Sequence, residues 1–234
     1  MDFSDLFSFS RLIENMPGVL GGLKITLAIV VSAFVFGSIL GFIIAIIRIR
    51  HIKILEQITL VYISFMRCTP LVVQLFVVYF GLPLLLDLIG IDINKWDKLF
   101  FVIVAYILNE GAFISELIRS SLLAVPSGQS EAAYSIGLNN VQTYVRIIIP
   151  QAVRIAIPGL SVQIINLFQG TSLAFLMGIL DMMGRAQGIS VDTYHALEAY
   201  IDVAIIFIAF SIIFERFFMW LNKKYTYTFA KGGY

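Results

Sequence analysis

The stretch EAAYSIGLNNVQTYVRIIIPQAVRIAIP, from Glu131 to Pro158, is the longest polar-bearing segment between two apolar blocks of the chain. Residues 130–136 favour a short helix, and Gly137 suits the left-handed position that ends one. Asn139, with Gln142 three residues later, can cap a second helix. The stretch therefore predicts a helix, a glycine corner and another helix.

The second helix of this hairpin is amphipathic. Apolar residues recur at the i, i+3, i+4 and i+7 spacing of one helical face, at Val141, Tyr144, Val145 and Ile148. Pro150 and Pro158 are expected to mark its exit. Such a hairpin can pack one face against the protein and present the other to a partner.

The composition indicates an integral membrane protein. Of the 234 residues, 59% are hydrophobic and 13% charged, and the mean hydropathy is +0.93. Soluble domains are usually about 45 to 50% apolar. The formal charge of +1 gives no nucleic-acid signal, and a single cysteine, Cys68, cannot form an intrachain disulfide. The first residues lack a basic region before an apolar core, so no cleavable signal peptide is expected.

Five apolar segments are long enough to cross a bilayer, which takes about 20 residues. They are residues 25–47, 68–86, 99–123, 155–180 and 199–221. The sequence thus predicts an all-α membrane protein with one transmembrane domain, 25–221. It also predicts an external segment at 1–24, a cytoplasmic tail at 222–234 and a short interfacial helix at 54–66.

The basic residues predict the orientation. With the N-terminus outside and the C-terminus inside, the inner set is Arg48, Arg50, Lys53, Arg67, Arg119, Arg146, Arg154, Arg216, Lys223, Lys224 and Lys231, and the outer set is Arg11, Lys24, Lys95, Lys98 and Arg185. The larger set is expected in the cytoplasm. The Glu131–Pro158 hairpin is then cytoplasmic.

Enzyme motifs are absent from the sequence. It has no GxSxG, HExxH, Cys/His cluster or GxxxxGK[ST] pattern, so serine, zinc and nucleotide chemistry lack their usual groups. No catalytic residue, metal ligand or cofactor is assigned to this chain. If it is part of an ATP-driven machine, the nucleotide site is expected on another chain.

Ionisable groups in the third segment are candidates for a transport pathway, because charges in a membrane are costly and usually functional. Glu116 has Arg119 three residues later on the same helical face, so it can line a pathway or form a local ion pair. Glu110 has no obvious local partner, which favours a role in translocation.

Polar and small residues in two other segments suggest helix contacts. The amides Gln163, Asn166 and Gln169 in the fourth segment can face a polar cavity or hydrogen-bond to a neighbouring helix. Gly37 and Gly41 form a GxxxG pattern, which is typical of two helices in close contact.

Three motifs carry a resemblance to a known family. EAA at 131–133, Gly137 and IIIPQAVRIAIP at 147–158 resemble the signature cytoplasmic loop of membrane subunits of ATP-binding-cassette (ABC) importers. RCTPLVVQLFVVYFGLP at 67–83 and NEGAFISELIRSSLLAVPSGQSEAA at 109–133 are similar to the polar amino acid branch of that family. The resemblance covers residues 22–224.

This resemblance implies the type I ABC importer permease fold in a bacterial cell membrane. It further implies a second permease, identical or similar, a pair of ATPase subunits that bind ATP and Mg, an external solute-binding protein and surrounding membrane lipid, with no nucleic acid. The coupling loop would cover about 124–157 and dock on the ATPase through Glu131, Ala132, Ala133, Gly137 and Leu138. L-cystine is the expected substrate.

The sequence departs from the family at two places. Gln169 and Gly170 stand where relatives usually have Lys-Asp, and Glu110 replaces a small residue. An ion-coupled secondary carrier is the alternative, although it would need inverted repeats that the sequence lacks. An intramembrane hydrolase built on Glu110 or Glu116 lacks a nucleophile pair or a metal set.

Overall fold

A computed structural model describes residues 7–230 of the protein, and every regular element in that part of the chain is helical. The elements are α2 (Phe9–Leu20), α3 (Leu23–Ile49), α4 (Lys53–Cys68), α5 (Leu71–Asp87), α6 (Lys98–Leu123), α7 (Ser127–Ser135), α8 (Asn140–Thr143), the π-helical η1 (Tyr144–Ile148), α9 (Ile149–Gly170), the 3₁₀ helix η2 (Thr171–Met177), α10 (Met182–Thr193) and α11 (Ala196–Ala230).

Four helices in the described part of the chain are long and apolar enough to cross a membrane. They are α3, α6, the continuous helix Asn140–Met177 and Ala196–Tyr225 of α11. The second predicted segment, 68–86, corresponds to α5, which is apolar but only 17 residues long. The predicted tail at 222–234 begins as part of α11, which continues without a break to Ala230, and residues 231–234 lie outside the described part.

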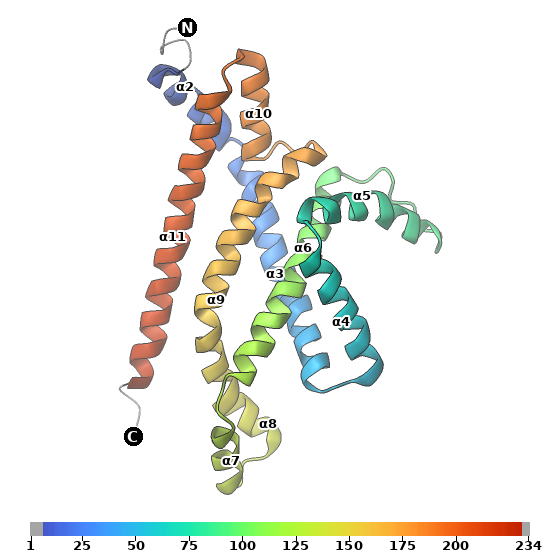
Figure 1. Ribbon diagram of the computed structural model, residues 1–234, viewed down its shortest axis with the longest axis vertical. Helices are drawn as coiled ribbons and strands as arrows, with labels where there is room; N and C mark the ends of the chain where they lie inside the picture. The colour runs from blue at the N-terminus through green and yellow to red at the C-terminus, as the bar shows by residue number, and fades with distance from the viewer. Residues whose placement is uncertain (1–6, 231–234) are drawn as a thin grey trace.

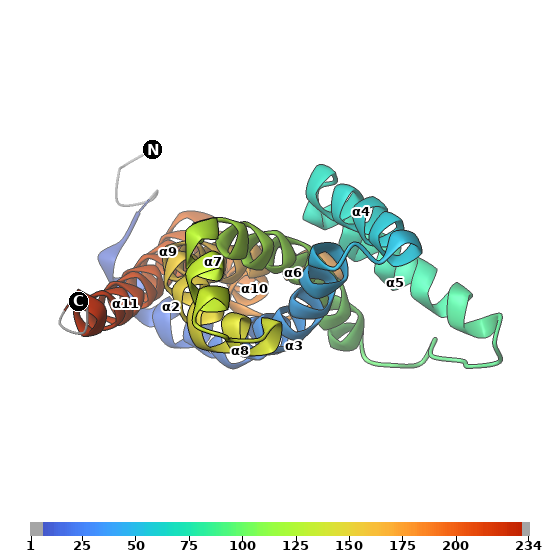
Figure 2. The same ribbon diagram turned by 90° about the horizontal axis from the view of Figure 1, so that it is seen from below.

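The long helices stand side by side, with different small helices at their two ends (Figure 1). Helices α2 and α10 gather at the end where α11 begins, and α7 and α8 lie at the opposite end (Figures 1 and 2). The main hydrophobic core joins residues of α2, α3, α5, α6, α9, η2, α10 and α11, and its fully buried members include Ile29, Tyr106 and Phe168.

Helices α3 and α6 make the closest helix contact, and the predicted GxxxG face is confirmed. A Cβ atom at Gly37 would lie 2.7 Å from Cβ of Glu110, and one at Gly41 would lie 2.9 Å from the backbone nitrogen of Ser115. The two glycines therefore let α3 approach the backbone of α6, where any side chain would push the helices apart.

We expect Gly41→Ala to lower the unfolding temperature of the protein, because overpacking against a backbone costs about 1 to 3 kcal/mol. Gly81→Ala in α5 is the matched control, since its Cβ would meet nothing within 4 Å and alanine favours a helix. The measurement is thermal unfolding of both variants in detergent. Equal unfolding temperatures would contradict the close-packing role of Gly41.

The short helix predicted at 54–66 is confirmed as α4, and it packs beside the middle of α6. Helix α4 rises beside α3 and α6 (Figure 1), and its Tyr62 hydroxyl donates to the carbonyl of Leu108, near the middle of α6. Ile63 and Met66 are buried against Ala112. Apolar residues on one face of α4 find a partner in the middle of α6, which the local sequence does not reveal.

The chain turns sharply between α4 and α5, as the sequence predicts at Pro70. Thr69 and Pro70 are extended, and α5 then runs away from the bundle (Figure 1). The buried Gln74 secures this corner, since its Nε2 donates to the carbonyl of Met66 at 2.8 Å and to that of Thr69 at 3.1 Å. The segment 68–86 is thus not a straight span that starts at one membrane surface, because α5 begins beside the middle of α6.

Candidate functional site

The Glu131–Pro158 hairpin forms the end of the molecule opposite α2 and α10 (Figure 1). Helix α7 ends at a corner in which Gly137 has φ of +83°, and the amide of Leu138 donates to the carbonyl of Ala133 at 3.1 Å. Asn139 and Gln142 form a capping box at the start of α8. The predicted glycine corner and cap are therefore confirmed, although α7 begins earlier than predicted, at Ser127.

The helix after the corner is not ended by its prolines, contrary to the prediction. Helix α8, η1 and α9 form one continuous rod through Pro150 and Pro158. The wide π turn at Tyr144–Ile148 lies directly before Pro150, and such a turn accommodates a residue that has no N–H to donate. The hairpin is thus continuous with a candidate span.

One hydrogen bond and one apolar cluster hold the hairpin in place. The Tyr134 hydroxyl donates to Oδ1 of Asn140 at 3.0 Å, across the two arms. At its base, Val125, Ile148 and Ala152 form a buried apolar cluster. The base of the hairpin therefore packs against the end of α6 and the start of α9.

The five residues predicted to contact an ATPase do not all face outward. Glu131, Ala132 and Gly137 are exposed, whereas Ala133 is buried and Leu138 partly buried within the chain. Ala133 therefore packs the hairpin instead of offering a docking contact. Ile136, which the sequence analysis missed, is 76% exposed beside Gly137 and extends the accessible surface.

Glu116 forms an ion-pair network that only partly matches the prediction. Arg119 Nη2 donates to Oε2 of Glu116 at 2.9 Å, as its spacing predicts. Arg48 of α3 pairs with the other carboxylate oxygen. The sequence could not reveal this second arginine, which is 68 residues away and approaches because α3 packs on α6.

Glu110 has a partner, which the sequence analysis did not foresee. It is 3% exposed, and Nε2 of Gln163 in α9 donates to its two carboxylate oxygens at 2.9 and 3.1 Å. Two candidate pathway residues from different helices are therefore brought together.

The three amides of α9 diverge. Gln163 points to α6, Gln169 Nε2 donates to the Ser211 hydroxyl of α11 at 3.3 Å, and Asn166 is exposed. Successive steps of three residues turn about 300° around a helix, so positions six apart no longer share a face. A single polar stripe over these residues is not formed.

Two further polar groups near the middle of α6 were missed. Asn109 donates to Oε1 of Gln74 at 2.9 Å, which links α6 to the corner before α5. Arg67 lies over the ring of Phe113 at 5.7 Å, although it was assigned to the inner membrane edge. A polar residue in each of two adjacent apolar segments was the available signal for the Gln74–Asn109 pair.

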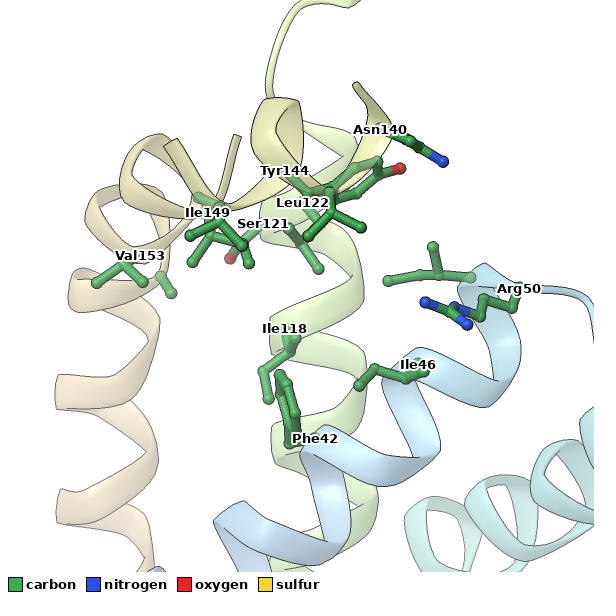
Figure 3. Close-up of a pocket in the computed structure, with 15 residues that line it drawn as sticks. Phe42, Ile46, Arg50, Ile118, Ser121, Leu122, Asn140, Tyr144, Ile149 and Val153 are labelled. Carbon is green, nitrogen blue, oxygen red and sulfur yellow. The ribbon is translucent and has the colours of Figure 1, made fainter. Parts of the chain in front are cut away.

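A cavity of about 580 Å³ lies between α3, α6 and the base of the hairpin (Figure 3). Its lining is mainly apolar, with Phe42, Ile46, Ile118 and Val153 among the residues, and Arg50 at one side. No group of three or more potential metal ligands occurs among the described residues.

An all-helical bundle with apolar spans, paired polar groups between them and a rigid hairpin at one end defines a class of membrane transport subunit. The chain matches the family described as the inner membrane component of binding-protein-dependent transport systems over residues 37–227, and it belongs to this family. It is therefore a multi-pass membrane protein.

Characterised relatives cover nearly the full chain. It is 40% identical to the L-cystine transport system permease protein TcyL of Bacillus subtilis (strain 168), over 93% of this chain and 91% of that protein. It is 37% identical to the L-cystine transport system permease protein TcyB of the same organism, over 82% of this chain and 79% of that protein.

Solved structures show the same fold. A chain of an amino acid ABC transporter crystallised with histidines is 28% identical, with a TM-score of 0.83 over 93% of this chain and 99% of that one. A chain of the MetNI methionine ABC transporter, at 16% identity, has a TM-score of 0.69 over 94% of this chain and 99% of that one, and shows the fold alone. The protein has the ABC importer permease fold.

Proposed function

We propose that this protein is the permease subunit of an ATP-driven importer for a polar amino acid, and that L-cystine is its substrate. The observation that carries the proposal is the 40% identity to an L-cystine permease over nearly the full length of both proteins. The motifs at 67–83 and 109–133 also support the amino acid branch.

The hairpin couples transport to a separate ATPase. Its exposed residues Glu131, Ala132, Gly137 and Ile136 form the docking surface, and Leu138 supports the corner. The continuous helix from Asn140 carries movement of the hairpin into the bundle. ATP and Mg are bound on that ATPase, which acts as a pair of subunits.

The pathway runs past the polar contacts between α6 and α9. Glu110 and Gln163 are joined inside the bundle, and the Glu116 network lies six residues further along α6 toward the hairpin. Asn166 and Gln169 are exposed on other faces of α9 and contribute to the pathway beyond the Glu110–Gln163 contact. A buried carboxylate held by an amide can exchange that partner for the ammonium group of a passing amino acid.

One chain forms half of the importer. Helix α5 exposes Phe76, Phe80 and Leu84 and leaves the bundle (Figure 2), so a second permease, identical or similar, covers part of this surface. An external solute-binding protein delivers the substrate at the end formed by α2 and α10. Membrane lipid surrounds the importer, and the protein binds no nucleic acid.

The topology in this proposal has five crossings, with the N-terminus outside, and α4 and α5 together supply the second. We expect a cysteine placed at Ser130 to react with an impermeant maleimide only after the cells are permeabilised. Cys68 is exposed and must first be replaced by serine. Labelling of residue 130 in intact cells would contradict this orientation.

The substrate is tested on the complete complex. The chain is purified from its native membrane, and any external protein that accompanies it is assayed by calorimetry for L-cystine, L-histidine, L-methionine and L-arginine. We expect tight binding of L-cystine alone, together with ATP-dependent uptake of labelled cystine into liposomes. Transport of another amino acid in place of L-cystine would support the importer function and contradict L-cystine as the substrate.

A further inference from the structure

The cavity at the base of the hairpin is amphipathic. The Arg50 guanidinium points into it, and Tyr144 and Asn140 lie on the same side, while Phe42 and Val153 lie away from these polar groups (Figure 3). Its volume of about 580 Å³ falls in the range of roughly 300 to 1,000 Å³ typical of small-molecule sites. The shape suits a ligand with a polar head and an apolar tail.

The polar end of the cavity offers hydrogen-bond donors from Arg50 and Asn140. Among the described residues, Arg50 forms no ion pair through its side chain. Oδ1 of Asn140 accepts from Tyr134, which leaves its amide Nδ2 to donate elsewhere. A guanidinium and an amide that both donate are suited to a phosphate or another anion.

The apolar end of the cavity lies along α3, a candidate membrane span. Phe42 precedes Arg50 by eight residues, so the two side chains are about 12 Å apart along α3. The adjoining face of α3 exposes Phe36, Ile39 and Ile43, and α3 is long and apolar enough to cross the membrane. The cavity therefore opens beside an exposed apolar face of a candidate membrane span.

The apolar stripe of the hairpin also ends here. Val141, Tyr144 and Val145 line the cavity, and Val141 and Val145 are largely exposed because no helix among residues 7–230 covers them. The π-helical segment η1 forms part of the same wall. A molecule in the cavity would contact both α3 and the rigid base of the hairpin.

We propose that this cavity binds one anionic phospholipid, with its phosphate on Arg50 and Asn140 and one acyl chain between α3, α6 and α9. Anionic lipids of the inner leaflet are attracted to basic groups at the membrane edge. A segment of a water-soluble partner is less suited, because it would have to enter the hydrocarbon about as far as Phe42. The inference concerns binding and does not depend on which amino acid is transported.

The test measures lipid retained by the purified protein. The chain, with whatever subunits accompany it, is incubated with equimolar phosphatidylglycerol and phosphatidylcholine in mild detergent, and bound lipid is counted by native mass spectrometry. We expect one phosphatidylglycerol per chain in preference to phosphatidylcholine. Arg50→Gln should lower this retention about fivefold, which is the contribution of one arginine near an anionic lipid.

Matched variants distinguish the contact with the lipid phosphate from the contact with the acyl chain. Lys53→Gln removes a nearby charge that does not line the cavity and should leave retention unchanged. Val153→Trp fills the cavity from an exposed position and should abolish retention, whereas Val162→Trp, exposed on the same helix outside the cavity, should not. If Val153→Trp does not fold, the comparison of Arg50→Gln with Lys53→Gln still tests whether Arg50 binds the lipid phosphate.

Three results would overturn the proposal. Equal retention in Arg50→Gln and wild type would exclude the phosphate contact, and equal retention of the two lipids would exclude selection by charge. Loss of an accompanying protein from Val153→Trp, with phosphatidylglycerol still bound, would show that a protein segment occupies the cavity.

Discussion

Replacing Glu116 by glutamine is expected to reduce the amount of folded protein severely. Arg48 and Arg119 both pair with this carboxylate, and their side chains are 12% and 31% exposed, so each would keep a poorly solvated charge without its partner. Removing one member of a buried pair costs about 3 to 5 kcal/mol, and the partial exposure of Arg119 places the effect near the lower figure. The measurement is the yield of monodisperse protein and its unfolding temperature.

Two comparisons test the cause. In Glu116→Gln combined with Arg48→Gln, the more buried of the two orphaned charges is gone, so part of the stability should return. Glu110→Gln should fold normally, because a glutamine oxygen can still accept from Gln163. Equal losses in Glu110→Gln and Glu116→Gln would show that the arginine network is not what Glu116 supplies.

The second large effect is expected at Gly137, where valine should uncouple ATP hydrolysis from transport. A Cβ there meets nothing within 4 Å, so the cost comes from the backbone, since φ is +83°. A left-handed conformation costs an L-residue about 1 to 2 kcal/mol, and more for a β-branched side chain. The corner should relax and turn Glu131 away from its docking position, while the helices of the bundle remain intact.

The matched variants isolate the backbone from the surface. Gly128→Val adds the same side chain in α7 at an open position with ordinary φ and should keep activity. Gly137→Asn should retain most of the coupling between ATP hydrolysis and transport, because asparagine tolerates left-handed φ. Glu131→Ala should uncouple by removing the contact itself. The assay is substrate-stimulated ATP hydrolysis in liposomes, with the amount of co-purified ATPase. Wild-type coupling in Gly137→Val would reject this corner as the coupling element.

The features that the sequence predicted are those set by neighbours along the chain. Gly137 and the Asn139–Gln142 capping box depend on a few adjacent residues, and so does the Glu116–Arg119 pair at i, i+3. The GxxxG face of α3 was also predictable, because two glycines one turn apart leave a groove that only another backbone fills.

Features that need a distant partner were missed or misread. Arg48 reaches Glu116 and Gln163 reaches Glu110 only because α3, α6 and α9 pack together. The helix end predicted at Pro150 was wrong for a related reason, since a helix held in a bundle can pass a proline by widening one turn.

The sequence by itself determined that this is a helical membrane protein of the ABC importer permease family, with an exposed hairpin built around Gly137. The length of apolar segments, capping residues and backbone preferences act locally, so they can be predicted from the sequence. The tertiary structure alone decided that Ala133 is buried, that α4 rests on the middle of α6 and that Arg50 faces an apolar cavity. These facts depend on which helix faces which, and that is fixed by packing across the whole bundle.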